Sequence, residues 1–165
     1  MKVTVLMAVL LICCAGIAVW AQAPLTTDFG RIKALQGVWE GASADRKPVS
    51  TTFSTTSGGF AVIQMFKPAS GPEKPTLYHY DGDRIMLTHY CSANNQPRLV
   101  FVASSGSDKT MKFSFLDATN LLSPETGHMH EVVFHFVDAN HFRQEWTWRE
   151  KGTDEVEAFD FVRKQ

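Results

Sequence analysis

The sequence predicts an all-β protein, a single antiparallel meander β-barrel of eight to ten strands preceded by a short N-terminal helix. Short runs of aromatic and β-branched residues recur along the chain after Gln36, and clusters of turn-forming residues separate them. No internal repeat is evident, so we expect one domain. The turn signals are Gly58-Gly59, Lys67 to Pro75, Asp81-Gly82-Asp83, Ser104 to Asp108, Ala139-Asn140 and Gly152.

The first 21 residues have the order of a secretory signal peptide. Lys2 supplies a positive charge, an apolar run follows from Val5 to Trp20, and small residues precede the first polar segment. A retained membrane anchor is the alternative, but the run is short for a bilayer span and no positive cluster follows it directly. We therefore expect cleavage after Ala21 and export to the periplasm or the extracellular space. The barrel domain is then residues 22–165, with no stable membrane anchor.

Cleavage changes the cysteine content and the charge of the chain. Removing 21 of the 165 residues leaves 144, enough for one domain with a sizeable core. Cys13 and Cys14 leave with the signal peptide, so Cys91 is the only thiol and no intramolecular disulfide can form. The formal net charge of -1 becomes -2 on loss of Lys2, and no long basic block remains. Nucleic acid and acidic membrane surfaces are therefore disfavoured, and a neutral or apolar partner is expected.

Hydrophobic alternation sets the register of the elements. Residues Thr27 to Gln36 are expected to form the helix, with Ile32 and Leu35 facing inward. In the last long hairpin, a two-residue loop would bury Arg143 and Glu145 beside phenylalanines, which favours a three-residue loop at Asp138 to Asn140. The inner face then carries His128, His130, Val132, Phe134, Phe136, Phe142, Gln144, Trp146 and Trp148.

The hairpin from Thr76 to Cys91 is assigned by the same reasoning. An even-length turn at Asp81 to Asp83 places alternate side chains of the two strands on one face, which we take to be the interior. This inner face carries Tyr78, Tyr80, Ile85, Leu87, His89 and Cys91.

The string Leu35-Gln36-Gly37-Val38-Trp39-Glu40-Gly41 resembles the Gly-x-Trp opening of lipocalin-like (calycin) barrels. The resemblance implies structural roles for Gly37, for Trp39 closing one barrel end, and for Arg163 lying across that tryptophan. The opening is also similar to nitrobindin-type haem barrels, although no iron-binding histidine is matched here. Longer strings across Leu35 to Arg163 resemble a family of exported bacterial proteins without assigned activity: Tyr78-His79-Tyr80-Asp81-Gly82-Asp83, Thr88-His89-Tyr90-Cys91, His128-Met129-His130 and Glu145-Trp146-Thr147.

Histidines and aromatic residues supply the candidate site. On one strand face, the His128-x-His130 imidazoles are about 6 to 7 Å apart and could chelate a metal, with His89 or Cys91 from another strand, or Glu150 opposite His128, as a third ligand. The simpler interpretation is that they form hydrogen bonds at a polar end of the cavity, so no metal is assigned. Cys91 is expected to be an inert thiol rather than a nucleophile activated by His89. The predicted ligand-binding residues are Tyr78, Tyr80, His89, Cys91, His128, His130, Phe134, Trp146 and Trp148.

Three functions fit these residues. The first is an exported binding protein that holds a small apolar or aromatic molecule in the barrel cavity, with the histidines orienting its polar end. The second is an isomerase, hydratase or hydrolase that uses the histidines as acid and base or as metal ligands. The third is a filled barrel whose outer surface binds another protein. The binding protein is preferred, and no catalytic residue, cofactor or oligomeric state is assigned.

Overall fold

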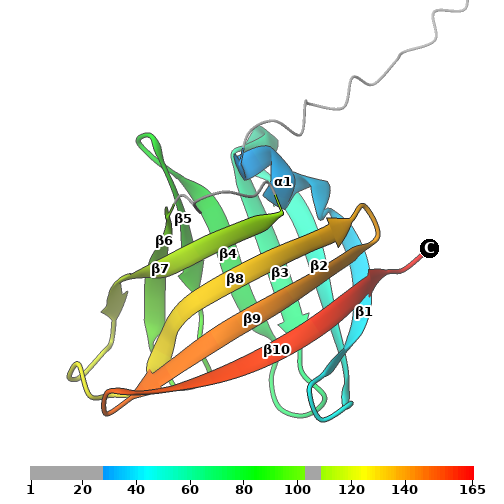
Figure 1. Cartoon of the computed structure of the whole chain (residues 1–165). Helices are drawn as coiled ribbons and strands as arrows, with labels where there is room; N and C mark the ends of the chain where they lie inside the picture. The colour runs from blue at the N-terminus through cyan, green and yellow to red at the C-terminus, as the bar shows by residue number, and fades with distance from the viewer. Residues whose placement is uncertain (1–27, 103–108) are drawn as a thin grey trace, which may run out of the picture.

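The structure is a computed structural model that describes residues 28–102 and 109–165. Within these ranges, ten antiparallel strands form a closed barrel in which each strand pairs with the next and β1 pairs with β10 (Figure 1). The predicted all-β meander is therefore confirmed. The predicted signal peptide, residues 1–21, and the predicted turn at Ser104 to Asp108 lie outside the described residues.

The described elements follow one another along the chain with short connections. They are α1 (Asp28–Ala34), β1 (Gly37–Ser43), β2 (Pro48–Thr56), η1 (Ser57–Gly59), β3 (Ala61–Lys67), β4 (Lys74–Asp81), β5 (Arg84–His89), β6 (Gln96–Val102), β7 (Thr110–Thr119), β8 (His128–Asp138), β9 (His141–Glu150) and β10 (Thr153–Arg163). No helix in the described ranges has the length and apolar character needed to cross a membrane.

The helix α1 covers one end of the barrel (Figure 1). Its span lies inside the predicted range, and Asp28 places a negative charge in the first turn, where the helix dipole favours it. Phe29 and Ile32 are buried in the barrel core, and Leu35 is buried directly after the helix. This end of the barrel is therefore closed by apolar side chains.

Trp39 and Arg163 complete the closed end in the arrangement expected from the calycin resemblance. The Arg163 guanidinium lies 4.1 Å from the centre of the Trp39 ring, and the indole Nε1 donates to the carbonyl of Leu35 at 2.7 Å. Arg163 also donates to the carbonyls of Gln36 and Ala34, at 2.6 and 2.8 Å. The Arg163 side chain thus connects the last strand, through hydrogen bonds, to the segment between the helix and the first strand.

A polar layer crosses the middle of the barrel. Tyr78 Oη donates to Gln64 Oε1 at 2.6 Å, and Gln64 Nε2 donates to Gln144 Oε1 at 2.9 Å and to Thr51 Oγ1 at 3.1 Å. Burial raises the pKa of the Tyr78 phenol, so the hydroxyl keeps its proton and remains a donor. The layer separates the aromatic core beneath α1 from the opposite end of the barrel.

Both predicted hairpin registers hold through the barrel core. In β4 and β5, Tyr78 opposes Leu87 and the turn contains two residues, as expected. In β8 and β9, Phe134 opposes Gln144, which is the register predicted for a three-residue loop. The chain reaches it with a tighter turn, because Asp138 opposes His141 and a bulge at Val137 restores the pairing.

A second bulge in β8 overturns one prediction. The register shifts between Met129 and Glu131, so that Met129 opposes Trp148 and His128 opposes Arg149. Directly opposed residues share a face of the sheet, so Met129 occupies the place opposite Trp148 that the predicted register gave to His130. The predicted grouping of His128 and His130 with Trp148 on the inner face is therefore wrong.

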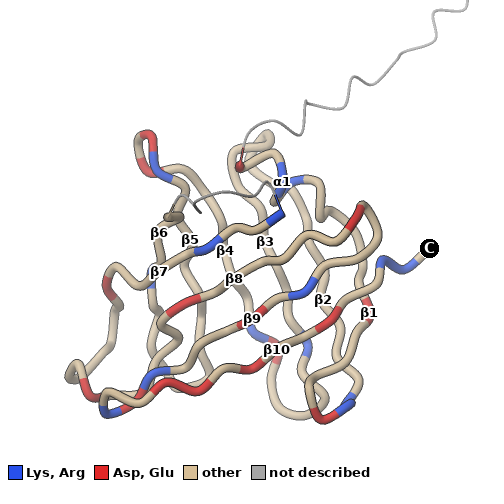
Figure 2. The backbone as a smooth tube through the Cα atoms, in the orientation of Figure 1, with Lys and Arg blue, Asp and Glu red and all other residues tan. Residues whose placement is uncertain are grey.

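Charged residues of both signs are distributed over the strands, and acidic residues gather along the first half of β10 (Figure 2). Several form exposed pairs between neighbouring strands, including Arg149 with Asp154 at 2.6 Å and Arg143 with Asp160 at 2.9 Å. Exposed pairs of this kind contribute little to stability individually.

Candidate functional site

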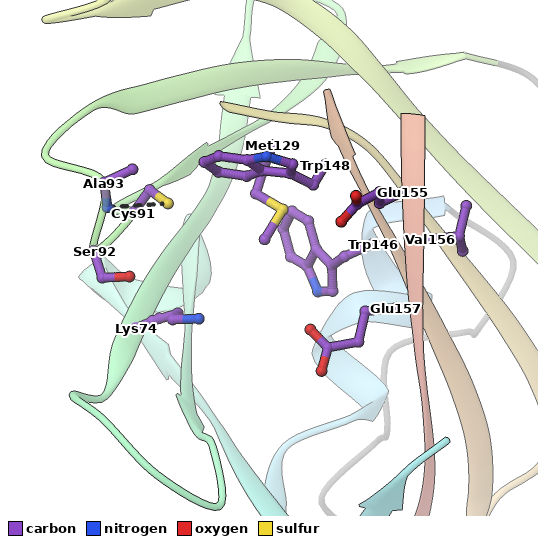
Figure 3. A pocket seen from close by; sticks show the side chains of 10 residues that line it. All are labelled: Lys74, Cys91, Ser92, Ala93, Met129, Trp146, Trp148, Glu155, Val156 and Glu157. Atoms are coloured by element: carbon purple, nitrogen blue, oxygen red, sulfur yellow. Dashed lines mark hydrogen bonds between the residues drawn. The ribbon is translucent and has the colours of Figure 1, made fainter. Parts of the chain in front are cut away.

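A cavity of about 500 Å³ opens at the barrel end opposite α1, which we call the open end. It lies where β4, β8, β9 and β10 meet the loop after β5 (Figure 3). Its lining residues are Lys74, Cys91, Ser92, Ala93, Met129, Trp146, Trp148, Glu155, Val156 and Glu157.

Two indoles and a thioether form the apolar part of the cavity wall. Trp146 is buried and Trp148 is half-buried, both on the inner face of β9, and Met129 reaches the same space from β8. Gly127 lets Trp148 lie flat against the chain, because a Cβ at residue 127 would fall 2.1 Å from the ring. The wall can therefore accept a flat apolar molecule.

Charged side chains line the outer part of the cavity. Lys74 and Glu157 reach into it from opposite sides, and Glu155 lies above Glu157 on β10 (Figure 3). Within the described ranges, none of these three makes an ion pair within 4.0 Å. The opening thus carries two carboxylates and one ammonium group.

A smaller cavity of about 20 Å³ lies deeper in the barrel. Lys74, Met129, Trp146 and Glu157 line both spaces, so the two adjoin. The deeper one has room for about one water-sized group. Its remaining lining residues are Gln64, Phe66, Thr76, His89 and Phe159.

His89 is the polar group at this inner end. Its ring lies 4.8 Å from the ring of Trp146, its Nδ1 is 2.8 Å from Thr76 Oγ1, and its buried Nε2 has no hydrogen-bond partner among the described residues. Burial, assisted by the positive charge of Lys74, lowers the pKa of His89 to about 3. The ring is therefore neutral at physiological pH.

Cys91 lies at the edge of the outer cavity as a half-buried free thiol. The Ala93 backbone N–H donates to its sulfur at 3.5 Å. In the described ranges, His89 has Thr76 as its hydrogen-bond partner and forms no hydrogen bond with this sulfur. The structure therefore does not form the nucleophile and base pair considered from the sequence.

Three predicted ligand-binding residues lie elsewhere in the barrel. Tyr78 and Phe134 are fully buried in the core and line neither cavity. Tyr80 is 45% exposed at the opposite end, where its ring lies 4.7 Å from that of Phe29. Tyr78 supports the polar layer, and Tyr80 packs against the helix that closes the barrel.

His128 and His130 form a separate cluster with Arg149 and Phe115. His128 Nδ1 lies 2.8 Å from the Thr126 carbonyl, which can only accept, so this nitrogen carries the proton. His128 Nε2 then accepts from His130 Nδ1 at 3.2 Å, and His130 Nε2 accepts from Arg149 at 2.6 Å. Both rings contact Phe115 and neither lines the cavities, so this chain of hydrogen bonds serves to hold the loop before β8.

The histidines considered as metal ligands do not meet. His89 lies at the deep cavity, whereas His128 and His130 bond to each other beneath the loop before β8. Across the described parts of the chain, no three His, Cys, Asp or Glu side chains are grouped so that they could hold a metal ion.

Sequence reasoning missed Lys74, Thr76, Met129, Glu155 and Glu157. A usable signal existed for four of them. Thr76 and Lys74 continue the inward phase of Tyr78 toward the start of β4, and Glu157 and Glu155 continue the inward phase of Phe159 along β10. Met129 could not be found this way, because the bulge that turns it inward leaves no mark in the alternation.

The comparisons with known proteins bear on the fold. No protein-family model and no curated protein matches the chain. Its structure is similar to a crystal structure of a protein with unknown function from the DUF3598 family of Nostoc punctiforme, with a TM-score of 0.55 and 11% sequence identity. The match covers 81% of this chain and 49% of that one, so this chain spans about half the length of its structural neighbour. At this identity the similarity shows the barrel fold alone.

Proposed function

We propose that this protein is an exported binding protein of calycin type that holds a small apolar or aromatic molecule at the open end of its barrel. The observation that carries the proposal is the cavity lined by Trp146, Trp148 and Met129. Its volume of about 500 Å³ falls within the range of small-molecule sites, which are mostly apolar clefts with a few polar groups. Export rests on the signal-peptide order of residues 1–21.

The composition of the site favours binding over the alternative of an isomerase, hydratase or hydrolase. That alternative requires several histidines around one substrate, and His89 is the one histidine among the described residues that line either cavity. With a pKa of about 3, its imidazole is also poorly suited to accept a proton near neutral pH. The same ring is well suited to form a hydrogen bond with a bound molecule.

The test uses N-phenyl-1-naphthylamine, an uncharged aromatic probe that fluoresces in apolar surroundings. We expect saturable binding at one site. Trp148→Ala should weaken it about fivefold, because a lost aromatic contact is worth about 1 kcal/mol and 1.4 kcal/mol corresponds to tenfold in affinity. Trp148 is half-buried, so the variant should fold.

Val162→Ala is the matched control, because Val162 is 51% exposed on β10 and lines neither cavity. It should bind the probe like the wild type. Linear uptake without saturation, or equal binding by wild type and Trp148→Ala, would refute the proposed site. If the probe binds as expected, mass spectrometry of an organic extract of the purified protein would identify a co-purified ligand.

A further inference from the structure

The unpartnered nitrogen of His89 defines the chemistry of the bound molecule. A buried polar atom without a partner costs free energy in the empty protein, and most such atoms in folded proteins are paired. His89 is 3% exposed, and its Nε2 lacks a partner where the ring borders the deeper cavity. An incoming group that pairs with this nitrogen therefore gains a hydrogen bond without displacing one inside the protein.

The partner of Nδ1 decides whether Nε2 donates or accepts. The Thr76 hydroxyl lies 2.8 Å from Nδ1 and has no other hydrogen-bond partner among the described residues. If Nδ1 carried the proton, the hydroxyl hydrogen and the Nε2 lone pair would both lack partners. If the hydroxyl donates to Nδ1, only the Nε2 hydrogen lacks one. The second arrangement leaves fewer unsatisfied groups, so Nε2 carries a proton and points a donor at the cavity.

The size of the deeper cavity limits what this donor can meet. About 20 Å³ admits one water-sized group, while the adjoining space of about 500 Å³ holds the remainder of a larger molecule. A molecule with one acceptor oxygen at the end of an aromatic ring system fits the two spaces together, with the oxygen in the deeper cavity and the rings in the outer one. Its ring would then lie along Trp146 and Trp148.

The charges that line the two cavities, taken together, do not favour an anion. Lys74 and Glu157 line both cavities and offset each other, and Glu155 adds a second carboxylate at the outer one, where Lys74 is the only cation among the described lining residues. A carboxylate would meet more negative than positive charge as it passes the outer cavity, and it would lose its hydration beside a neutral imidazole. An uncharged carbonyl oxygen accepts the same hydrogen bond without this penalty.

We propose that the cavity recognises uncharged aromatic carbonyl compounds, which enter with the carbonyl oxygen toward the Nε2–H of His89. This inference rests on the proposed binding function and names its ligand class. Thr76 is the positioning residue, because its hydroxyl holds His89 in the tautomer that donates. Lys74 and Glu157, which line both cavities, and Glu155, which lines the outer one, flank the remainder of the molecule.

Three indoles of similar size test the ligand class by calorimetry: 3-acetylindole, 3-ethylindole and indole-3-carboxylate. The wild-type protein should bind 3-acetylindole about tenfold more tightly than the other two, which corresponds to about one hydrogen bond made to a buried donor. His89→Phe keeps a ring beside Trp146 and removes the donor, so this variant should bind 3-acetylindole and 3-ethylindole equally. His79→Phe, on a strand residue that lines neither cavity, should keep the wild-type preference.

The outcomes separate this inference from the proposed function. Equal binding of 3-acetylindole and 3-ethylindole by the wild type would overturn the inference and leave the cavity as a binding site, with water satisfying His89. Tighter binding of indole-3-carboxylate would also overturn it. Failure of all three indoles to bind would overturn this inference, and binding of N-phenyl-1-naphthylamine would then decide whether the proposed function stands. Nitrogen NMR of the wild type tests the tautomer without a substitution, and a proton on Nδ1 of His89 would contradict the argument directly.

Discussion

Acid should destabilise this fold through His89. The imidazole has a pKa of about 3 in the folded protein against an ordinary value of 6.5, chiefly because burial disfavours its charged form. The unfolded chain therefore binds a proton that the folded chain excludes. Stability from this group is complete above pH 6.5 and is lost as the pH falls from 6.5 toward 3.

The magnitude follows from the difference in pKa. At pH 4.5, two units below the unfolded value, protonation of the unfolded chain should lower the free energy of unfolding by about 3 kcal/mol. This change is a large share of the stability of a typical domain, which is about 5 to 15 kcal/mol. The effect should therefore be measurable in an ordinary denaturation experiment.

Urea unfolding followed by tryptophan fluorescence provides the assay. The free energy of unfolding is measured at pH 7.5 and pH 4.5 for the wild type and for His89→Phe. Carboxylates titrate in both proteins, so the difference between their two pH dependences isolates the histidine. The wild type should lose about 3 kcal/mol more than the variant over this interval. Equal losses would show that His89 is not held neutral by burial, and would refute the reasoning.

Three further predictions concern other parts of the chain. Arg163→Ala should lower the free energy of unfolding by about 1 to 2 kcal/mol in urea, because it removes the hydrogen bonds to the carbonyls of Gln36 and Ala34 and the cation over the Trp39 ring; a loss below 0.5 kcal/mol would contradict this. Gly127→Ala should displace the Trp148 ring and weaken N-phenyl-1-naphthylamine binding about tenfold, and unchanged affinity would count against the described wall. Intact mass of the exported protein should show that it begins at Gln22, whereas a retained Met1 would refute the predicted cleavage.

Alternation of apolar residues predicted the barrel core correctly because charge burial is costly. The placement of Phe134 beside Gln144 followed from excluding Arg143 and Glu145 from the interior, and the structure has this register. The form of the turn was not predictable in the same way. A three-residue loop and a tighter turn with a bulge at Val137 give the same pairing beyond the turn, so the pattern of the strands cannot distinguish them.

The same alternation failed for His128 and His130, and the reason is physical. Period-two reasoning extends along a strand only until the backbone inserts an extra residue, after which each side chain changes face. The bulge before Glu131 places Met129 opposite Trp148, where unbroken alternation would have placed His130. An apolar Met129 between two histidines does not contradict either orientation, because the flexible methionine side chain is accommodated on either face of a half-buried sheet.

The charged residues of the cavity could be predicted by extending the inward alternation to the ends of β4 and β10. Along β10, the inward positions change from Phe161 and Phe159 near α1 to Glu157 and Glu155 at the open end. Along β4, they change from Tyr78 to Thr76 and then Lys74.

An inner face can become charged only where water or a ligand reaches it, since an unpaired charge in a dry core is prohibitively costly. The change from aromatic to charged inward residues therefore marks the boundary between the filled and the hollow part of the barrel. His89 lies at that boundary, buried like the core residues above it and facing the open space below, and this position makes its free Nε2 available to a bound molecule.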